Sequence, residues 1–301
     1  MDRYHWADHI ARLDPDADHH EIYRILVAHE FPWDMTQSLS FALYRTYAVP
    51  SIGGLLYETR ELTERTQKRY DDTALILDAV LRHGLAGAEG RAAVRRMNQM
   101  HGRYAISNDD MRYVLANFVV MPTRWLDEYG WRRLTEHERI ASANYYRALG
   151  RHMGIRDIPA THGGFAELLD RYEREHFAYD AGAREVSDAT LRLMATFPPN
   201  HLAPEALARW FALGLMDAPL LDAFGYRRPS RVERAVAHGA LRLRGRIVRH
   251  LPPRVEPLYA ARQPNVRGYP DGYDVADLGT FGPGCPVPHR ATPRDPAADV
   301  S

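Results

Sequence analysis

Apolar residues at helical spacing dominate the chain, and capping signals stand at the ends of several of these segments. Asp72 is a typical N-cap, and Gly84 a typical terminator, for an apolar helical run between them. Thr135 and Glu138 have the spacing of a capping box at the start of another helix. No segment alternates apolar and polar residues convincingly with period two, as half-buried strands do. The pattern predicts an all-α fold.

The domain organisation follows from where helical periodicity ends. The chain has no internal repeat and no central Gly/Ser linker, which favours one large helical bundle domain over residues 1–252. From residue 253 to residue 301 the sequence is rich in proline and glycine and loses its helical period. We expect an irregular C-terminal tail there, extended or disordered.

Composition limits the classes of partner. Hydrophobic residues make up 45% of the chain and charged residues 26%, and 39 basic side chains balance 39 acidic ones. No overall field therefore attracts nucleic acid, and no nucleic-acid partner is expected. Cys285 is the sole cysteine, and the N-terminal sequence lacks a signal-peptide pattern. These features predict a cytoplasmic protein.

Two predicted helices carry polar residues on their inward faces. At helical spacing, Val94, Met97, Asn98 and His101 form one stripe, and Asn117 lies inside an apolar run of the next helix. A buried polar side chain costs a few kcal/mol unless it is satisfied. The pattern indicates a shared pocket or ligand. The alternative for His101 is a core histidine hydrogen-bonded to a backbone carbonyl.

A second inward histidine lies in a later helix. Ala141, Tyr145, Ala148 and His152 form a stripe of mostly small residues, which would leave room beside a large planar ligand. The alternative is that His152, next to Arg151, is stabilised by the negative pole at the end of the helix.

Other motifs are weak or absent. Glu173 and His176 have the Glu-x-x-His spacing of di-iron helix bundles. Such bundles use the motif twice, whereas this chain has it once. A di-iron oxygenase is therefore a minor alternative. Nucleotide-binding glycine motifs and nucleophile elbows are missing. The basic amphipathic helix over residues 231–250 could lie on an anionic membrane surface, giving a membrane-peripheral protein, or could simply have a solvated face.

Three segments, residues 31–73, 95–125 and 129–159, together resemble the MpaB-type oxygenase family, which includes rubber-cleaving latex clearing proteins. The resemblance runs from about residue 31 to residue 197. It implies an all-α fold that holds haem b and acts with dioxygen on carbon-carbon double bonds of isoprenoid chains. It also implies an oxidoreductase whose substrate is apolar, either isoprenoid or lipid-like.

The family pattern places functional residues on this chain. Its arginine-and-histidine spacing falls on Arg96 and His101, and its following polar turn on Tyr104. Many relatives have their iron-ligating histidine at the position that Leu115 occupies here. The resemblance therefore leaves His101, or alternatively His152, to bind the iron, unless the haem is bound differently or has been lost.

The remaining candidate residues would support such a haem. A ligating histidine needs a partner for its other ring nitrogen, and Asn98 or Asn117 could supply it, the latter also as a catalytic group beside Arg96 and Tyr104. Haem propionates need cations, and the candidates are Arg103, Arg132 and Arg151, each of which could instead be solvated. The rival hypothesis is a haem-binding or lipid-binding module without turnover.

Overall fold

The computed structural model describes residues 1–279, and within that range it contains α-helices, short 3-10 and π turns and no strand. No helix of this range has both the length and the apolar character needed to cross a membrane. The predicted all-α fold is confirmed. The α-helices are α1 (His5–Ile10), α2 (His19–Ile25), α3 (Pro32–Thr46), α4 (Pro50–Glu58), α5 (Glu61–Glu64), α6 (Thr66–His83), α7 (Ala88–His101), α8 (Asn108–Tyr129), α9 (Glu136–His152), α10 (His162–His176), α11 (Ala181–Ala195), α12 (Glu205–Leu215), α13 (Ala218–Ala223) and α14 (Arg231–Val248).

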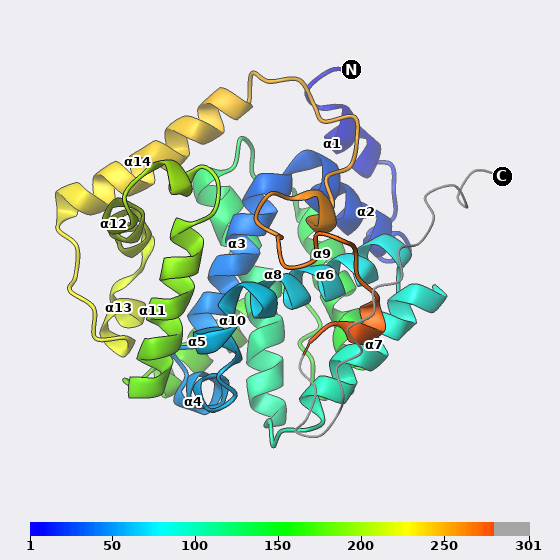
Figure 1. Cartoon of the computed structure of the whole chain (residues 1–301). Helices are drawn as coiled ribbons and strands as arrows, with labels where there is room; N and C mark the ends of the chain where they lie inside the picture. Colours follow the sequence, from blue (N-terminus) through cyan, green and yellow to red (C-terminus); the bar gives the residue numbers. More distant parts are fainter. Residues whose placement is uncertain (280–301) are drawn as a thin grey trace.

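Helix α8 is central to the bundle. It packs against α3, α9, α10 and α14, while α6 pairs with α7 and α2 covers α9 (Figure 1). Its start is fixed by Ser107, whose hydroxyl accepts a hydrogen bond from the backbone amide of Asp110 at 2.9 Å. Its buried residues include Leu115, Ala116 and Val119. The apolar run therefore forms a helix, as the sequence pattern predicts, and Ser107 caps its start.

A second core cluster lies where α4 and α11 approach each other. Tyr44, Leu220 and Phe224 are almost completely buried in it. The approach requires Gly53, because a Cβ there would lie 2.5 Å from the Cβ of Ala183. This part of the bundle thus depends on a residue without a side chain.

The predicted capping box of α9 and the predicted terminator of α6, Gly84, are confirmed, whereas the predicted N-cap of α6 is wrong. Thr135 and Glu138 form the expected capping box. Helix α6, however, begins six residues before Asp72. The side chain of Asp72 is 2% exposed, and its carboxylate accepts a hydrogen bond from Lys68 at 2.8 Å and another from Tyr269. Its carboxylate therefore joins distant segments and caps nothing.

Residues 253–279 cross the face of the bundle as an irregular segment, which we call the strap (Figure 1). Carboxylates of α6 hold it: Asp71 accepts hydrogen bonds from the amides of Arg267 and Gly268 at 3.1 and 2.6 Å, and Asp78 accepts one from Ala260 at 3.0 Å. Burial raises the pKa of both aspartates. The strap is thus extended and packed. The later part of the predicted tail, with Cys285, lies outside the described residues.

Leu278 anchors the end of the strap, and its loss should be costly. The side chain is fully buried, and its backbone carbonyl accepts a hydrogen bond from Arg96 at 2.7 Å. Leu278→Ala is expected to lower the free energy of unfolding by about 2–5 kcal/mol, as measured by urea denaturation. Val255→Ala in the same segment is the control, because Val255 is 62% exposed. Equal stabilities for the two variants would show that the strap is not anchored at Leu278.

Candidate functional site

A cavity of about 390 Å³ lies between α3, α4, α6, α7, α8, α9 and the strap. Most of the side chains around it are apolar. Ligand pockets of proteins commonly have this size, with an apolar lining and a few placed polar groups. Its lining includes Leu39 and Leu43 of α3, Ile52 and Leu55 of α4, Ile76 and Leu77 of α6, Met97 and Met100 of α7, Val114 and Phe118 of α8, Tyr145 and Leu149 of α9, and Leu258 and Val266 of the strap.

His101, the last residue of α7, lines this cavity. Its Nδ1 is buried and has no hydrogen-bond partner within residues 1–279, so the alternative of a core histidine satisfied at that nitrogen does not hold. Burial, together with the positive charge of Arg69, lowers the pKa of His101 to about 4. The imidazole is therefore neutral at physiological pH, the form that binds metal ions.

Arg69 of α6 also lines the cavity and was not recognised from the sequence. Among the lining residues it is the one with a guanidinium or ammonium group. Its guanidinium donates a hydrogen bond to Thr73, one turn along the helix. Thr66, Arg69, Thr73 and Leu77 share one face of α6 at helical spacing, and this periodicity is the signal that could have revealed it.

Two further positions from the family pattern meet His101 at this cavity. Tyr104, in the turn after α7, and Leu115, on α8, both line it. Leu115 is 3% exposed. Tyr104 and Leu115, the positions that the resemblance singled out, thus lie around the same space as His101.

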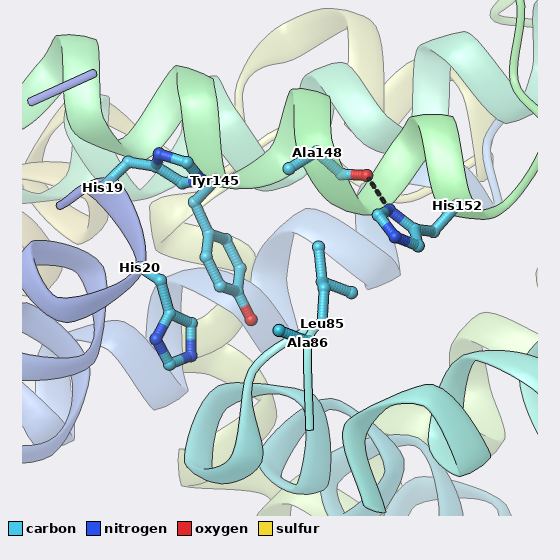
Figure 2. A pocket seen from close by; sticks show the side chains of 7 residues that line it. All are labelled: His19, His20, Leu85, Ala86, Tyr145, Ala148 and His152. Atoms are coloured by element: carbon cyan, nitrogen blue, oxygen red, sulfur yellow. Dashed lines mark hydrogen bonds between the residues drawn. The ribbon is translucent and has the colours of Figure 1, made fainter. Parts of the chain in front are cut away.

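His152 lies elsewhere, in an open hollow between α2 and α9. Figure 2 shows His152 beside Ala148 on one helix, with His19 and His20 around the same hollow. The Nδ1 of His152 lies 2.9 Å from the carbonyl oxygen of Ala148. The two hollows have Tyr145 in common as a lining residue. His101 and His152 therefore do not converge on one site.

The two asparagines proposed as partners of a ligating histidine do not line the cavity. Asn98 donates to the backbone carbonyl of His152 at 2.9 Å and so links α7 to α9. Asn117 is 1% exposed and donates to the carbonyl of Tyr113 at 3.1 Å, while its Oδ1 is buried without a partner among residues 1–279. Neither is hydrogen-bonded to His101 in this range.

The predicted arginines also lie away from the cavity lining. Arg96 is 6% exposed and bonds the strap through the carbonyl of Leu278. Arg132 forms ion pairs with Glu30 and Glu138 at 2.8 and 2.7 Å. The side chains of Arg103 and Arg151 are exposed at the surface.

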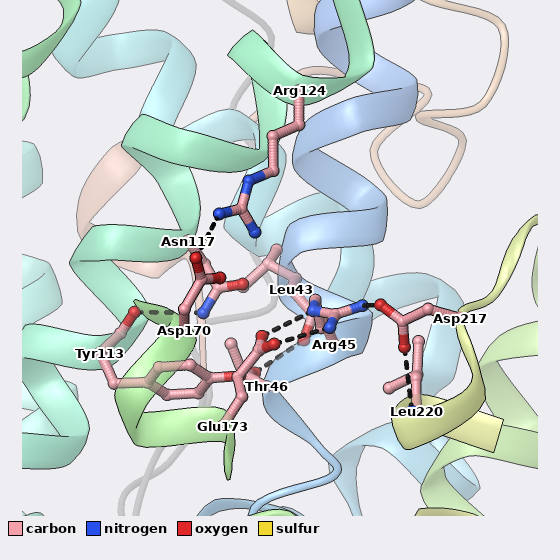
Figure 3. A network of polar contacts seen from close by, with 10 residues as sticks. All are labelled: Leu43, Arg45, Thr46, Tyr113, Asn117, Arg124, Asp170, Glu173, Asp217 and Leu220. Atoms are coloured by element: carbon pink, nitrogen blue, oxygen red, sulfur yellow. Dashed lines mark hydrogen bonds and ion pairs between the residues drawn. The ribbon is translucent and has the colours of Figure 1, made fainter. Parts of the chain in front are cut away.

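The glutamate of the Glu-x-x-His motif, Glu173, belongs to a buried ion-pair network (Figure 3). Arg45 donates two hydrogen bonds of 2.6 Å to the carboxylate of Glu173 and pairs with Asp217 at 2.6 Å. Tyr113 donates to Glu173 at 3.2 Å. His176 is exposed, and no cluster of three or more potential metal ligands occurs within residues 1–279. Glu173 is therefore engaged in structure.

Fold and cavity define an all-α protein that encloses an apolar space with one neutral histidine. The model of the catalytic domain described as "ER-bound oxygenase mpaB/B'/Rubber oxygenase" matches residues 39–250, and the chain belongs to this family. Its sequence is 30% identical over 264 residues to ER-bound oxygenase mpaB' of Penicillium brevicompactum, an alignment that covers 81% of this chain and 61% of that protein. It is 28% identical to ER-bound oxygenase mpaB of Penicillium roqueforti over 70% of this chain and 76% of that protein.

Proposed function

We propose that the protein is an oxygenase that uses haem b and dioxygen to oxidise an apolar isoprenoid or lipid-like substrate in the described cavity. The observation that carries this proposal is His101 on the wall of an apolar cavity, with its Nδ1 buried and without a hydrogen-bond partner among residues 1–279. Membership of an oxygenase family supports the reaction class. Cleavage of a carbon-carbon double bond is the specific reaction that the sequence resemblance implies.

The residues around the cavity fit haem b. His101 would hold the iron, since it is the one imidazole among the lining residues of the described chain and Leu115 cannot ligate. Arg69 would pair with a propionate, since guanidinium groups bind carboxylates strongly. When bound, the haem supplies the oxidative chemistry, and the protein supplies orientation and a dry surrounding. His101 contributes a neutral nitrogen without first having to lose a proton.

The lining also suits an apolar substrate. Met97, Met100, Met111 and Met153 contribute flexible thioether side chains to it. Methionine fills irregular spaces and adapts to differently shaped apolar ligands. The few carboxylates there, such as Asp110, would not favour an anionic substrate. A hydrocarbon chain is the class of ligand that this lining supports.

The alternative function is haem or lipid binding without turnover, and Leu115 is the residue that favours it. An apolar side chain stands at the position where many relatives carry their ligand, so the chemistry of the site could differ from theirs. A cytoplasmic location, expected from the sequence, stays a prediction.

Titration of the purified protein with haemin tests the proposal. We expect a Soret band that saturates at about one haem per chain, as a single histidine-bound site requires. Oxygen uptake by this complex with squalene, an isoprenoid hydrocarbon, would separate the oxygenase from the binding protein. Saturable haem binding without uptake would favour the alternative, and absence of a saturable Soret band would contradict both haem-based functions.

A further inference from the structure

Helix α14 presents an apolar stripe to solvent. Val232, Val236, Leu243 and Ile247 are 72, 51, 56 and 55% exposed. Their spacings of four, seven and four residues place them on one face of the helix. The opposite face is buried through Ala237, Leu241 and Gly245. We call the four exposed residues the α14 stripe.

The exposed apolar surface continues beyond the helix. Leu251, just before the strap, and Val255, near its start, are 51 and 62% exposed. Scattered exposed aliphatic residues need no explanation, but several of them on one face of a helix indicate an interaction site. Packing within residues 1–279 leaves this row uncovered.

A row of arginines follows one edge of the stripe. At 100° per residue, Arg231, Arg242, Arg246 and Arg249 project to the same side of Val232 and Leu243. Arg242 pairs with Glu128, whereas Arg231, Arg246 and Arg249 are exposed and form no ion pair within the described chain. The single acidic residue of α14, Glu233, is held at the other edge by Arg227.

We propose that α14 binds an anionic membrane surface, with the α14 stripe buried at the boundary of the acyl chains and the arginines on the lipid headgroups. An interfacial helix combines these same two features, an apolar face and a basic edge. The inference does not depend on the haem proposal, because no residue of the stripe lines the cavity.

The shape of the surface favours a membrane over a protein partner. Helix α14 lies along the outer edge of the bundle as a ridge (Figure 1), and its 18 residues extend about 27 Å. The stripe contains only aliphatic side chains, which can be buried among acyl chains without leaving a polar group unsatisfied. The unpaired arginines are complementary to headgroup phosphates and carboxylates.

Vesicle co-sedimentation of the full chain tests this inference. The probes are vesicles of phosphatidylcholine alone and vesicles that also contain phosphatidylserine. We expect binding to the mixed vesicles and much weaker binding to phosphatidylcholine. The double variant Leu243→Ser/Ile247→Ser should abolish binding to both kinds of vesicle. Arg246→Gln with Arg249→Gln should weaken binding to the mixed vesicles by about 30-fold, since each arginine near an anionic surface contributes about a fivefold factor.

A matched control is available on α10. Arg171 and Arg174 are exposed and have the same spacing as Arg246 and Arg249, so Arg171→Gln with Arg174→Gln should bind like the unchanged protein. Circular dichroism checks that every variant is folded. The proposal would be overturned if the unchanged protein did not bind the mixed vesicles. It would also be overturned if the two double arginine variants, on α14 and on α10, lost vesicle affinity equally. The proposal would also fail if the unchanged protein formed a dimer and the double variant Leu243→Ser/Ile247→Ser were a monomer. In that case a second copy of the chain would cover the α14 stripe.

Discussion

Replacing His101 with alanine is expected to weaken haem binding by at least about 100-fold, since even the loss of a residue that only supports a metal ligand costs 10- to 100-fold. The reason is that no other imidazole lines the cavity in the described chain. Titration with haemin, followed at the Soret maximum, measures the effect. Thermal unfolding of the variant without haem shows whether the fold is retained.

His152→Ala is the control for this experiment. His152 is exposed in a different hollow, so its loss should leave both the Soret maximum and the haem affinity unchanged. If His152→Ala abolished haem binding and His101→Ala did not, the ligand would belong to α9. If the two variants both bound haem like the unchanged protein, the proposed cavity site would be wrong.

Replacing Arg45 with methionine should have the largest effect on stability. Arg45 and Glu173 have side chains only 7 and 8% exposed, and the substitution leaves the Glu173 carboxylate buried without its cation. Breaking a buried pair in this way costs about 3–5 kcal/mol, which urea denaturation would measure. Asp217 loses its partner at the same time, although it is more exposed.

An exposed ion pair supplies the comparison for Arg45. Arg60 and Glu64 have side chains 75 and 60% exposed, and pairs of this kind contribute at most about 1 kcal/mol. Arg60→Met should therefore unfold at nearly the urea concentration of the unchanged protein. Similar losses in Arg45→Met and Arg60→Met would mean that the buried network adds little to stability.

The fold was predictable because its main signals are local. A capping box such as that of Thr135 and Glu138 forms within one turn of helix, and the helical period of apolar residues is read from one segment. Asp72 was misread for the opposite reason. Its contact with Tyr269 joins residues nearly two hundred positions apart, and a carboxylate that caps a helix looks the same in sequence as one that holds a distant segment.

The site was predictable where a single helix determines it. His101 was found from its place on the inward stripe of one helix, and Tyr104 and Leu115 from the family pattern. Arg69 was missed because its approach to His101 depends on how α6 packs against α7. Arg103, Arg132 and Arg151 lie nearer to the predicted histidines in sequence, but the packing of the helices places all three outside the cavity lining.

The strap has a consequence for the order of events during synthesis. Part of the cavity wall comes from the strap, through Leu258, Ala260, Gln263, Asn265, Val266 and Gly279, whereas the rest of the wall comes from residues between 23 and 193. A ribosome releases the N-terminal helices first, and they can begin to pack before the strap emerges. The wall is complete only after residue 279 has left the exit tunnel. The ligand is therefore enclosed late, when nearly the whole bundle has already been made.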